Sequence, residues 1–193
     1  MTVMKSLTNK VAAEFAANGA ISSEVSRALA VSGAKLYLSG RNPEAVQQLA
    51  DEITANGGIA HPFQVDATSE SQIEAFIQSV IAKEGGLHVV FNGIGLRAGN
   101  LQYGTPSTVL PFEKFMEAIQ VHLGSQFLTS RVAAKHMMAA GSEGTIITLS
   151  SSLSRIKVPF MAGVTAACAG IEGLTRVLAT EIGRYGIRVT CLN

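Results

Sequence analysis

The stretch Leu87-His88-Val89-Val90-Phe91 decides the fold, because it indicates a short strand that is apolar on both faces. A second run of this kind, Thr145-Ile146-Ile147-Thr148-Leu149, follows after a long segment of helical period. Strands buried on both faces are typical of parallel sheets whose crossover helices cover both sides. The middle of the chain therefore predicts βαβ units and a parallel sheet.

Segments on both sides of this middle part repeat the alternation of strand and helix. Further strands are expected at 35–39, 62–65 and 187–191, and helices at 43–55, from Ser69 to about Gly85, at 112–140 and at 162–182. Pro43 can begin one of these helices, and Ser69 with Gln72 can form a capping box on the next. We expect residues 1–193 to form one α/β domain of three layers, a doubly wound parallel sheet of about six strands.

The composition limits the classes of partner and compartment. The chain has 193 residues, of which 47% are hydrophobic, enough for one sizeable core. A net charge of +1 with only 15% charged residues gives no reason to expect nucleic acid or an anionic membrane as a partner. Cys168 and Cys191 lack the spacing of a metal or redox motif, so no metal site is expected. No apolar run reaches membrane-spanning length, and we expect a cytoplasmic protein.

The segment from Lys10 to Val25 indicates the first strand, turn and helix of this sheet. Open parallel sheets bind ligands at the carboxyl ends of their strands, and the first turn usually holds a phosphate. Glycines there allow a tight turn and let backbone N–H groups approach the phosphate. Gly19 is the only glycine at the bend of this turn, so a phosphate site with few glycines is expected.

Successive landmarks of the chain resemble the short-chain dehydrogenase/reductase family from about Leu7 onward, in both order and spacing. They are Lys10-Val11-Ala12, Ser39-Gly40-Arg41-Asn42, Asp66-Ala67-Thr68, Phe91-Asn92-Gly93-Ile94-Gly95, Leu149-Ser150-Ser151 and Glu172-Gly173-Leu174-Thr175-Arg176. The resemblance implies a Rossmann-like fold and an NAD(P)-dependent oxidoreductase of unknown substrate. It also implies a set of cofactor-binding residues, namely Gly19, Ile21, Arg41, Asp66, Asn92 and Gly93.

The glycine fingerprint of this family is missing from the first turn. Its three glycines fall on Ala16, Ala20 and Ser22. We expect the Cβ atoms of Ala20 and Ser22 to stand where the backbone of relatives meets the cofactor phosphate, which would weaken or abolish cofactor binding.

The remaining cofactor positions each have a second interpretation. Arg41 resembles the arginine with which some relatives bind the 2′-phosphate, which favours NADP over NAD, but it can equally be an exposed loop cation. Asp66 resembles the acid that meets the adenine, but it can instead cap the following helix. Asn92 and Gly93 resemble the small residues beside the cofactor, but they can be a turn only.

The catalytic residues of the family are mostly replaced. Ser151 matches the serine, whereas Val164 and Cys168 occupy the positions of the Tyr-x-x-x-Lys pair and His122 that of the upstream asparagine. In the family the tyrosine delivers a proton as hydride arrives, and the lysine lowers the pKa of that tyrosine. His122 is the candidate substitute acid because imidazole titrates near neutrality, although a histidine on a long helix can simply be packed. Ser151 can likewise serve only the turn backbone.

Two function hypotheses follow from these replacements. One is a divergent oxidoreductase with impaired or no activity of the Ser-Tyr-Lys type, using a nonstandard acid if any. The other is a catalytically silent Rossmann-fold module for binding or oligomerisation. The family commonly forms dimers or tetramers through the helices expected here at 112–140 and 162–182, so a homo-oligomer is expected, although small residues on these helices could instead pack against the sheet.

Two departures from the family pattern affect the fold. Glu14 falls in the first strand where an apolar residue is expected, so we predict that the strand is shortened or slipped there, or that Glu14 reaches the cofactor cleft. The sequence ends at Asn193, where relatives continue with a substrate loop and a last strand. We therefore expect a sheet that stops after its sixth strand, with an apolar edge at 187–191 that a partner covers or that belongs to a longer natural chain.

Overall fold

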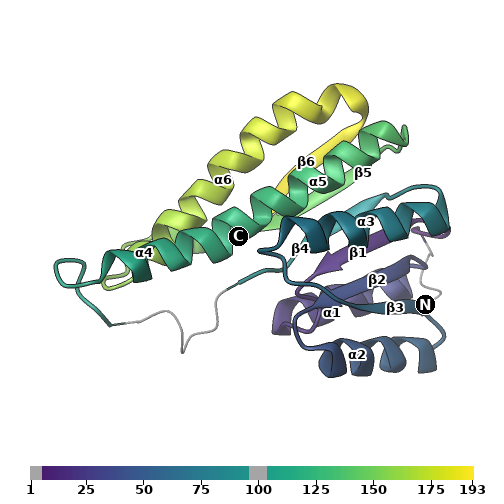
Figure 1. Cartoon of the computed structure of the whole chain (residues 1–193), viewed down its shortest axis with the longest axis horizontal. Helices are drawn as coiled ribbons and strands as arrows, with labels where there is room; N and C mark the ends of the chain where they lie inside the picture. The colour runs from purple at the N-terminus through teal and green to yellow at the C-terminus, as the bar shows by residue number, and fades with distance from the viewer. Residues whose placement is uncertain (1–5, 96–103) are drawn as a thin grey trace.

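The computed structural model describes residues 6–95 and 104–193 and contains one parallel sheet (Figure 1). Its six strands are β1 (Val11–Phe15), β2 (Lys35–Gly40), β3 (Ile59–Gln64), β4 (Val89–Asn92), β5 (Gly144–Leu149) and β6 (Ile187–Leu192). Across the sheet their order is β3-β2-β1-β4-β5-β6. The winding direction reverses between β1 and β4, and ligands bind at such a reversal in doubly wound folds.

Helices cover both faces of the sheet and complete the three predicted layers (Figure 1). They are α1 (Ala20–Val31), α2 (Pro43–Ala55), α3 (Glu70–Glu84), α4 (Phe112–Ala118), α5 (Ser125–Ala139) and α6 (Ala162–Ile182). Ala13 and Phe15 of β1 pack in a core with α3 and α5, whereas Ala12 packs in a second core with α2. In residues 6–95 and 104–193, no helix combines the length and apolar character needed to cross a membrane.

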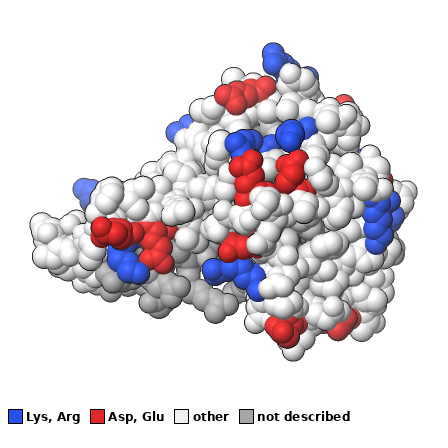
Figure 2. Space-filling view, viewed as in Figure 1, with Lys and Arg blue, Asp and Glu red and all other residues white. Residues whose placement is uncertain are grey.

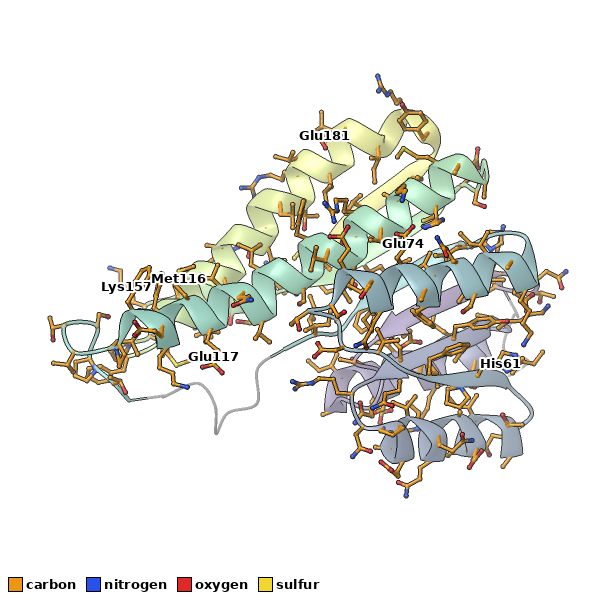
Figure 3. All side chains as sticks on the ribbon, in the orientation of Figure 1. His61, Glu74, Met116, Glu117, Lys157 and Glu181 are labelled. Carbon is orange, nitrogen blue, oxygen red and sulfur yellow. The ribbon has the colours of Figure 1, made fainter. Side chains whose placement is uncertain are left out.

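On the face shown in Figure 2, several charged side chains lie beside side chains of opposite charge. Glu74 of α3 accepts hydrogen bonds from Lys135 Nζ at 3.1 Å and His136 Nε2 at 2.7 Å, both on α5 (Figure 3). Glu70 pairs with Arg131 between the same two helices. These exposed pairs align α3 with α5 and contribute little to stability by themselves.

The predicted fold class is confirmed, with local differences in the boundaries. The segments 43–55 and 162–182 are helical with the expected ends. The strand expected at 62–65 lies instead at Ile59–Gln64, because β3 pairs with β2 from Lys35↔Ile59 to Gly40↔Gln64. Pro62 is tolerated there because β3 is an edge strand.

The predicted capping box at the start of α3 is wrong. Ser69 is the N-cap residue, but its side chain makes no capping hydrogen bond. Gln72 Oε1 accepts instead from the backbone N–H of Asp66 at 2.8 Å. Gln72 therefore joins α3 to the loop after β3, which lies at the carboxyl end of the sheet.

The helix expected at 112–140 changes its winding in the middle. Residues Ile119–Gly124 form a π-helical segment between α4 and α5, and the three parts run on as one helical rod (Figure 1). His122 lies inside this segment. Short π segments are frequent at functional sites because they redirect side chains without ending the helix.

The predicted rearrangement of β1 around Glu14 is wrong. The strand is regular and pairs in register on both sides, with Glu14 opposite Leu38 of β2 and Phe91 of β4. The Glu14 side chain is fully buried and accepts a hydrogen bond from Ser26 Oγ at 2.8 Å. Burial raises the pKa of Glu14 to about 8, so the carboxyl is mainly neutral at pH 7 and the strand can hold it without an ion pair.

The turn after β1 has the tight geometry of a nucleotide fold without the glycine that usually provides it. Ala16 adopts a φ of 57°, in the left-handed region. Ala17 N–H donates to Ser39 C=O at 2.9 Å, and Gly19 N–H donates to Ala16 C=O at 3.0 Å. These bonds hold Ala16 in a conformation that disfavours a Cβ atom.

Replacing Ala16 with glycine should therefore stabilise the protein. Ala16→Gly is expected to raise the free energy of unfolding by about 1 kcal/mol, since glycine adopts this conformation without the Cβ clash. The change can be measured by urea unfolding followed by circular dichroism. Ala17→Gly is the matched control: Ala17 is buried and has no positive φ, so this variant should be less stable. A loss of stability in Ala16→Gly would contradict the strain.

Candidate functional site

The start of α1 is built like an anion site at the reversal point of the sheet. Gly19 is the N-cap residue, and no side chain caps the helix there. The bond from Ser23 N–H to Gly19 C=O, 2.9 Å long, begins the helical ladder. Helix geometry leaves the N–H groups of Ala20, Ile21 and Ser22 without intrahelical acceptors, and such groups bind phosphate.

The Ser22 side chain does not project from the exposed helix start, and the expected weakening of cofactor binding stays a prediction. The Ser22 side chain is only 1% exposed and points inward, whereas Ala20 and Ile21 are exposed at the helix start. A Cβ atom added to Gly93 would lie 1.8 Å from Ser22 Oγ. Gly93 therefore makes room for Ser22, and the N-terminus of α1 is open except for the methyl group of Ala20 and the side chain of Ile21.

Arg41 and Asp66 lie at the carboxyl ends of β2 and β3, beside this helix start. Arg41 is exposed. Asp66 Oδ1 accepts hydrogen bonds from Thr68 N–H at 2.9 Å and Thr68 Oγ1 at 2.7 Å. These two bonds lower the pKa of Asp66, and the charge of Arg41 lowers it further, so the Asp66 carboxylate is ionised. The carboxyl ends of β1, β2, β3 and β4 share one edge of the sheet, and we call this edge, with the start of α1, Arg41 and Asp66, the nucleotide crevice, after the crevice in which doubly wound folds bind nucleotides.

Asn92 and Gly93 form the floor of the nucleotide crevice at the end of β4. Gly93 N–H donates to Phe15 C=O at 3.1 Å, which holds β4 against the end of β1. Asn92 is fully buried, and its Nδ2 donates to Ser130 Oγ of α5 at 3.2 Å. Asn92 Oδ1 has no hydrogen-bond partner. Gly93 thus joins β4 to β1, and Asn92 joins β4 to α5. The two residues therefore do more than form the turn that the sequence indicated.

Ser151 and Cys168 meet beyond the end of β5, in a region that we call the catalytic corner. Ser151 Oγ lies 3.5 Å from Cys168 Sγ and accepts a hydrogen bond from Leu153 N–H at 3.3 Å. Ser150 Oγ donates to Cys168 C=O at 3.1 Å. The structure therefore brings Ser151 and Cys168 into contact, the two residues that the resemblance matches to the serine and the lysine of the family motif.

The rest of the catalytic corner is apolar. Val164 is 8% exposed and packs with Ala118 and Cys168, and partly buried Leu153 and Met161 pack against them. A cavity of about 10 Å³ beside Val164 is no larger than one water molecule needs. Val164 has no proton to donate, and the thiol of Cys168 lacks the positive charge of a lysine ammonium group.

His122 faces the backbone at the end of β5 and is nearly buried. Its Nδ1 has no hydrogen-bond partner, and burial lowers the pKa of His122, partly opposed by a hydrogen bond to the Leu149 backbone. In the described parts of the chain, no hydrogen bond joins His122 to Ser151. A neutral imidazole is a weak acid, so the geometry gives His122 no direct advantage as a proton donor.

Two further side chains hold the catalytic corner, Gln126, which the sequence did not single out, and Glu172, which begins one of the family landmarks. Gln126 accepts from Leu149 N–H at 3.0 Å and donates to Leu149 C=O at 2.8 Å, which fixes the end of β5. Glu172 accepts from Ser154 Oγ, from Arg155 at 3.2 Å and from Asn193 at 3.0 Å. The Ser154 bond, with those from Asn193 and Arg155, lowers the pKa of Glu172 to about 2. In the sequence, the only local indication of a role for Gln126 is its position one helical turn after His122.

The small residues of the two long helices pack mainly within the chain. Ala133, Ala134 and Ala167 are buried, and a Cβ atom on Gly170 would lie 2.6 Å from the Leu123 side chain. Ala169 is exposed. The expected homodimer or tetramer stays a prediction, because the alternative, packing inside the chain, accounts for most of these residues.

The amino-acid sequence matches the family model described as short chain dehydrogenase over residues 10–193. The chain belongs to the short-chain dehydrogenase family. A 2,5-dichloro-2,5-cyclohexadiene-1,4-diol dehydrogenase of Sphingobium indicum is 29% identical over 164 residues, 85% of this chain and 63% of the relative. The cyclohexanol dehydrogenase of an Acinetobacter species is 29% identical over 185 residues, 96% of this chain and 72% of that enzyme. The chain thus spans less than two thirds of the length of the Sphingobium relative.

Solved structures of this family share the fold of the chain. A short chain dehydrogenase from Mycobacterium smegmatis has a TM-score of 0.91 at 26% identity, covering 99% of this chain and 78% of the other. A metagenomic short-chain oxidoreductase in complex with NADP has a TM-score of 0.87 at 30% identity, covering 96% and 82%. Membership in this family makes the chain a homologue of NAD(P)-dependent oxidoreductases.

The closed packing of the catalytic corner can be tested through its thiol. Cys168 is fully buried, whereas Cys191 is partly exposed, so we expect one thiol to react quickly with dithionitrobenzoate and the other only after unfolding. Cys191→Ser should remove the fast reaction and Cys168→Ser should leave it, as followed by absorbance. Loss of the fast reaction in Cys168→Ser would show that the catalytic corner is open to solvent.

Proposed function

We propose that this chain binds a nicotinamide dinucleotide, NADP in preference to NAD, and lacks the Ser-Tyr-Lys hydride-transfer activity of its family. The observation that carries the proposal is the contrast between the two halves of the site. The nucleotide crevice has an open helix start and polar groups, whereas Val164 and Cys168 close the catalytic corner with apolar packing. Its substrate, if the protein has one, stays unknown.

Support for cofactor binding comes from the residues around the start of α1. The N–H groups of residues 20–22 suit the pyrophosphate, and Arg41 beside the crevice suits a 2′-phosphate. Asp66 is ionised and held in place by Thr68, so it can accept hydrogen bonds from the adenosine part. The relative solved with NADP supports this choice of cofactor. A bound cofactor of this class supplies or accepts the hydride.

Support for lost chemistry comes from proton transfer. A carbonyl that receives hydride needs a proton, and a positioned acid normally delivers it. Val164 has no proton to give, and Cys168 is a buried thiol without the charge of an ammonium group. Of the described tyrosines, Tyr37 donates to Glu84 at 2.7 Å and Tyr185 accepts from Arg184 at 3.0 Å, so both are engaged elsewhere. Tyr103 lies outside the described residues.

The competing hypotheses rest on specific features. A substitute acid at His122 is favoured by the π segment that carries it and by its unpartnered Nδ1. A silent module for oligomerisation alone is favoured by apolar side chains left exposed on α5 and α6, namely Phe127 and Val177. We retain the homo-oligomer as a proposal that is compatible with cofactor binding.

The central experiment measures binding and turnover on the same protein. Titration of NADPH, followed by its fluorescence, should show saturable binding, while NADPH oxidation with a panel of ketones and aldehydes should not exceed the protein-free rate. The double variant Val164→Tyr with Cys168→Lys tests whether the missing pair is the cause, and any gain of turnover should require Ser151. The proposal would be overturned if the unmodified protein turned over a substrate and His122→Ala or Tyr103→Phe abolished that turnover. If NADPH did not bind, only the hypothesis of a silent module would remain.

The choice between the two cofactors depends on Arg41. Arg41→Ala should weaken NADPH binding roughly tenfold or more and leave NADH binding almost unchanged, because a charge-assisted bond to the 2′-phosphate is lost. Competition titrations with NADP and NAD measure this ratio. Arg184→Ala is a control of equal charge change, because Arg184 is exposed and precedes β6 at the opposite edge of the sheet. An equal effect of Arg41→Ala on both cofactors would show that Arg41 does not select between them.

A further inference from the structure

Glu14 is a buried ionisable group beside the nucleotide crevice for which neither the fold nor the family chemistry gives a role. It is the residue before the last in β1, between Leu38 and Phe91 of the neighbouring strands. Its Oε2 accepts from Ser26 Oγ, and its Oε1 has no partner. Burial of an acid in the centre of a sheet destabilises the protein unless the acid stays neutral.

The elements around Glu14 offer it hydroxyl groups and apolar side chains. From α1 it meets Ser26, one turn after Ser22, whose Oγ is also buried without a partner. From β2 come Leu38 and Ser39, whose hydroxyl donates to the Glu14 backbone oxygen at 2.7 Å. From β4 comes Phe91. None of these side chains can neutralise a carboxylate.

The charged residues of the adjacent helices are engaged elsewhere. On α1, Arg27 pairs with Glu24 at 2.6 Å and with Glu52 of α2 at 2.7 Å, on the solvent side. Helix α3 covers the opposite face of β1, and its acids Glu70, Glu74 and Glu84 pair with the bases Arg131, Lys135, His136 and Lys35. Across the described residues, the pKa of Glu14 depends on burial and on the Ser26 hydroxyl, so no ion pair opposes the effect of burial.

The turn of α1 that touches Glu14 through Ser26 directly follows the turn that begins the anion site. Ser22 and Ser26 lie one turn apart on the side of α1 that packs against β1 and β4. The preceding turn contains the strained Ala16, so its geometry depends on the few hydrogen bonds that hold it. A negative charge on Glu14 would favour entry of water between Glu14 and α1 or a shift of α1 away from β1. The charge would also repel a pyrophosphate at the start of α1.

We propose that Glu14 is a pH-sensitive switch of the nucleotide crevice, with the neutral carboxyl holding α1 in its binding position and the carboxylate weakening both this packing and the binding of an anionic dinucleotide. This inference rests on the proposed function, because it concerns regulation of the same site. Binding and ionisation are linked, so when an anionic cofactor that disfavours the carboxylate binds at alkaline pH, Glu14 takes up a proton from solvent.

The direction of the effect on stability follows from the raised pKa. In the unfolded chain Glu14 ionises near 4.5, and in the folded protein burial raises this pKa to about 8. The stability that the neutral carboxyl contributes is therefore complete below pH 4.5 and is lost progressively as pH rises through 8. Cofactor affinity should be constant at pH values where Glu14 of the free protein is protonated, and it should fall above pH 8. Because one proton is involved, the fall is at most roughly tenfold per pH unit.

The first experiment needs no cofactor. Urea unfolding midpoints are measured between about pH 4 and pH 9 for the unmodified protein and for Glu14→Gln, which keeps the size of the side chain and cannot ionise. The advantage of Glu14→Gln over the unmodified protein should grow with pH up to about 8 and then level off. Glu24→Gln is the matched control on the exposed side of α1 and should follow the unmodified protein. If Glu14→Gln folds poorly, Glu14→Leu provides the same comparison.

The second experiment measures NADPH affinity of the same variants across the same pH range. The unmodified protein and Glu24→Gln should bind more weakly above pH 8, whereas Glu14→Gln should lack that loss, since titration of NADPH itself affects all variants equally. Identical pH profiles of stability for Glu14→Gln and the unmodified protein would overturn the switch even if NADPH binds. If stability depends on pH as expected but NADPH does not bind at any pH, the proposed function and the link between Glu14 and cofactor binding are both overturned. The raised pKa of the buried Glu14 would still stand.

Discussion

The close packing of α1 on the ends of β1 and β4 is the constraint on which the nucleotide crevice depends. Ser22 occupies a position where the family has glycine, and its hydroxyl touches the place where a side chain on residue 93 would be. Only glycine at position 93 allows this contact, so the helix start stays close to the sheet and open to a ligand. The turn before it is completed by Ala16 in a left-handed conformation. At two of the three positions that the resemblance matches to the family glycines, Ala16 thus adopts a left-handed conformation and Ser22 is buried.

The catalytic corner has changed in a different way. Its backbone framework persists, because Gln126 fixes the end of β5 and Glu172 holds the loop after Ser151. The side chains that would do proton transfer are replaced by Val164 and Cys168, which pack with Ala118. Under the proposed function, the family scaffold would separate into a part that holds a nucleotide and a part that lacks the tyrosine and lysine. The short-chain dehydrogenase fold alone does not establish an activity, because the chemistry belongs to these side chains.

The fold could be predicted from the sequence because its signals are local. Pro43 begins α2 as expected, and the two runs apolar on both faces became β4 and β5. The position of β3 was wrong because an edge strand with His61 and Pro62 carries no clear pattern, and its pairing with β2 decides its start. The π segment around His122 was missed because one extra residue per turn leaves the apolar pattern of a helix almost unchanged.

The site was predicted less completely, because its contacts join distant parts of the chain. Ser151 and Cys168, which the resemblance matches to the serine and lysine of the family, lie in contact, whereas their roles stay predictions. The neutral burial of Glu14 depends on Ser26 and the surrounding strands, and no sequence window contains that environment.

The most direct test of the central claim is a crystal structure of the protein with NADPH. We expect the pyrophosphate at the N–H groups of residues 20–22 and Val164 and Cys168 beside Ser151 as the nearest side chains to the nicotinamide. A tyrosine hydroxyl or a lysine amine from elsewhere in the chain, within hydrogen-bond distance of Ser151 Oγ, would contradict the account.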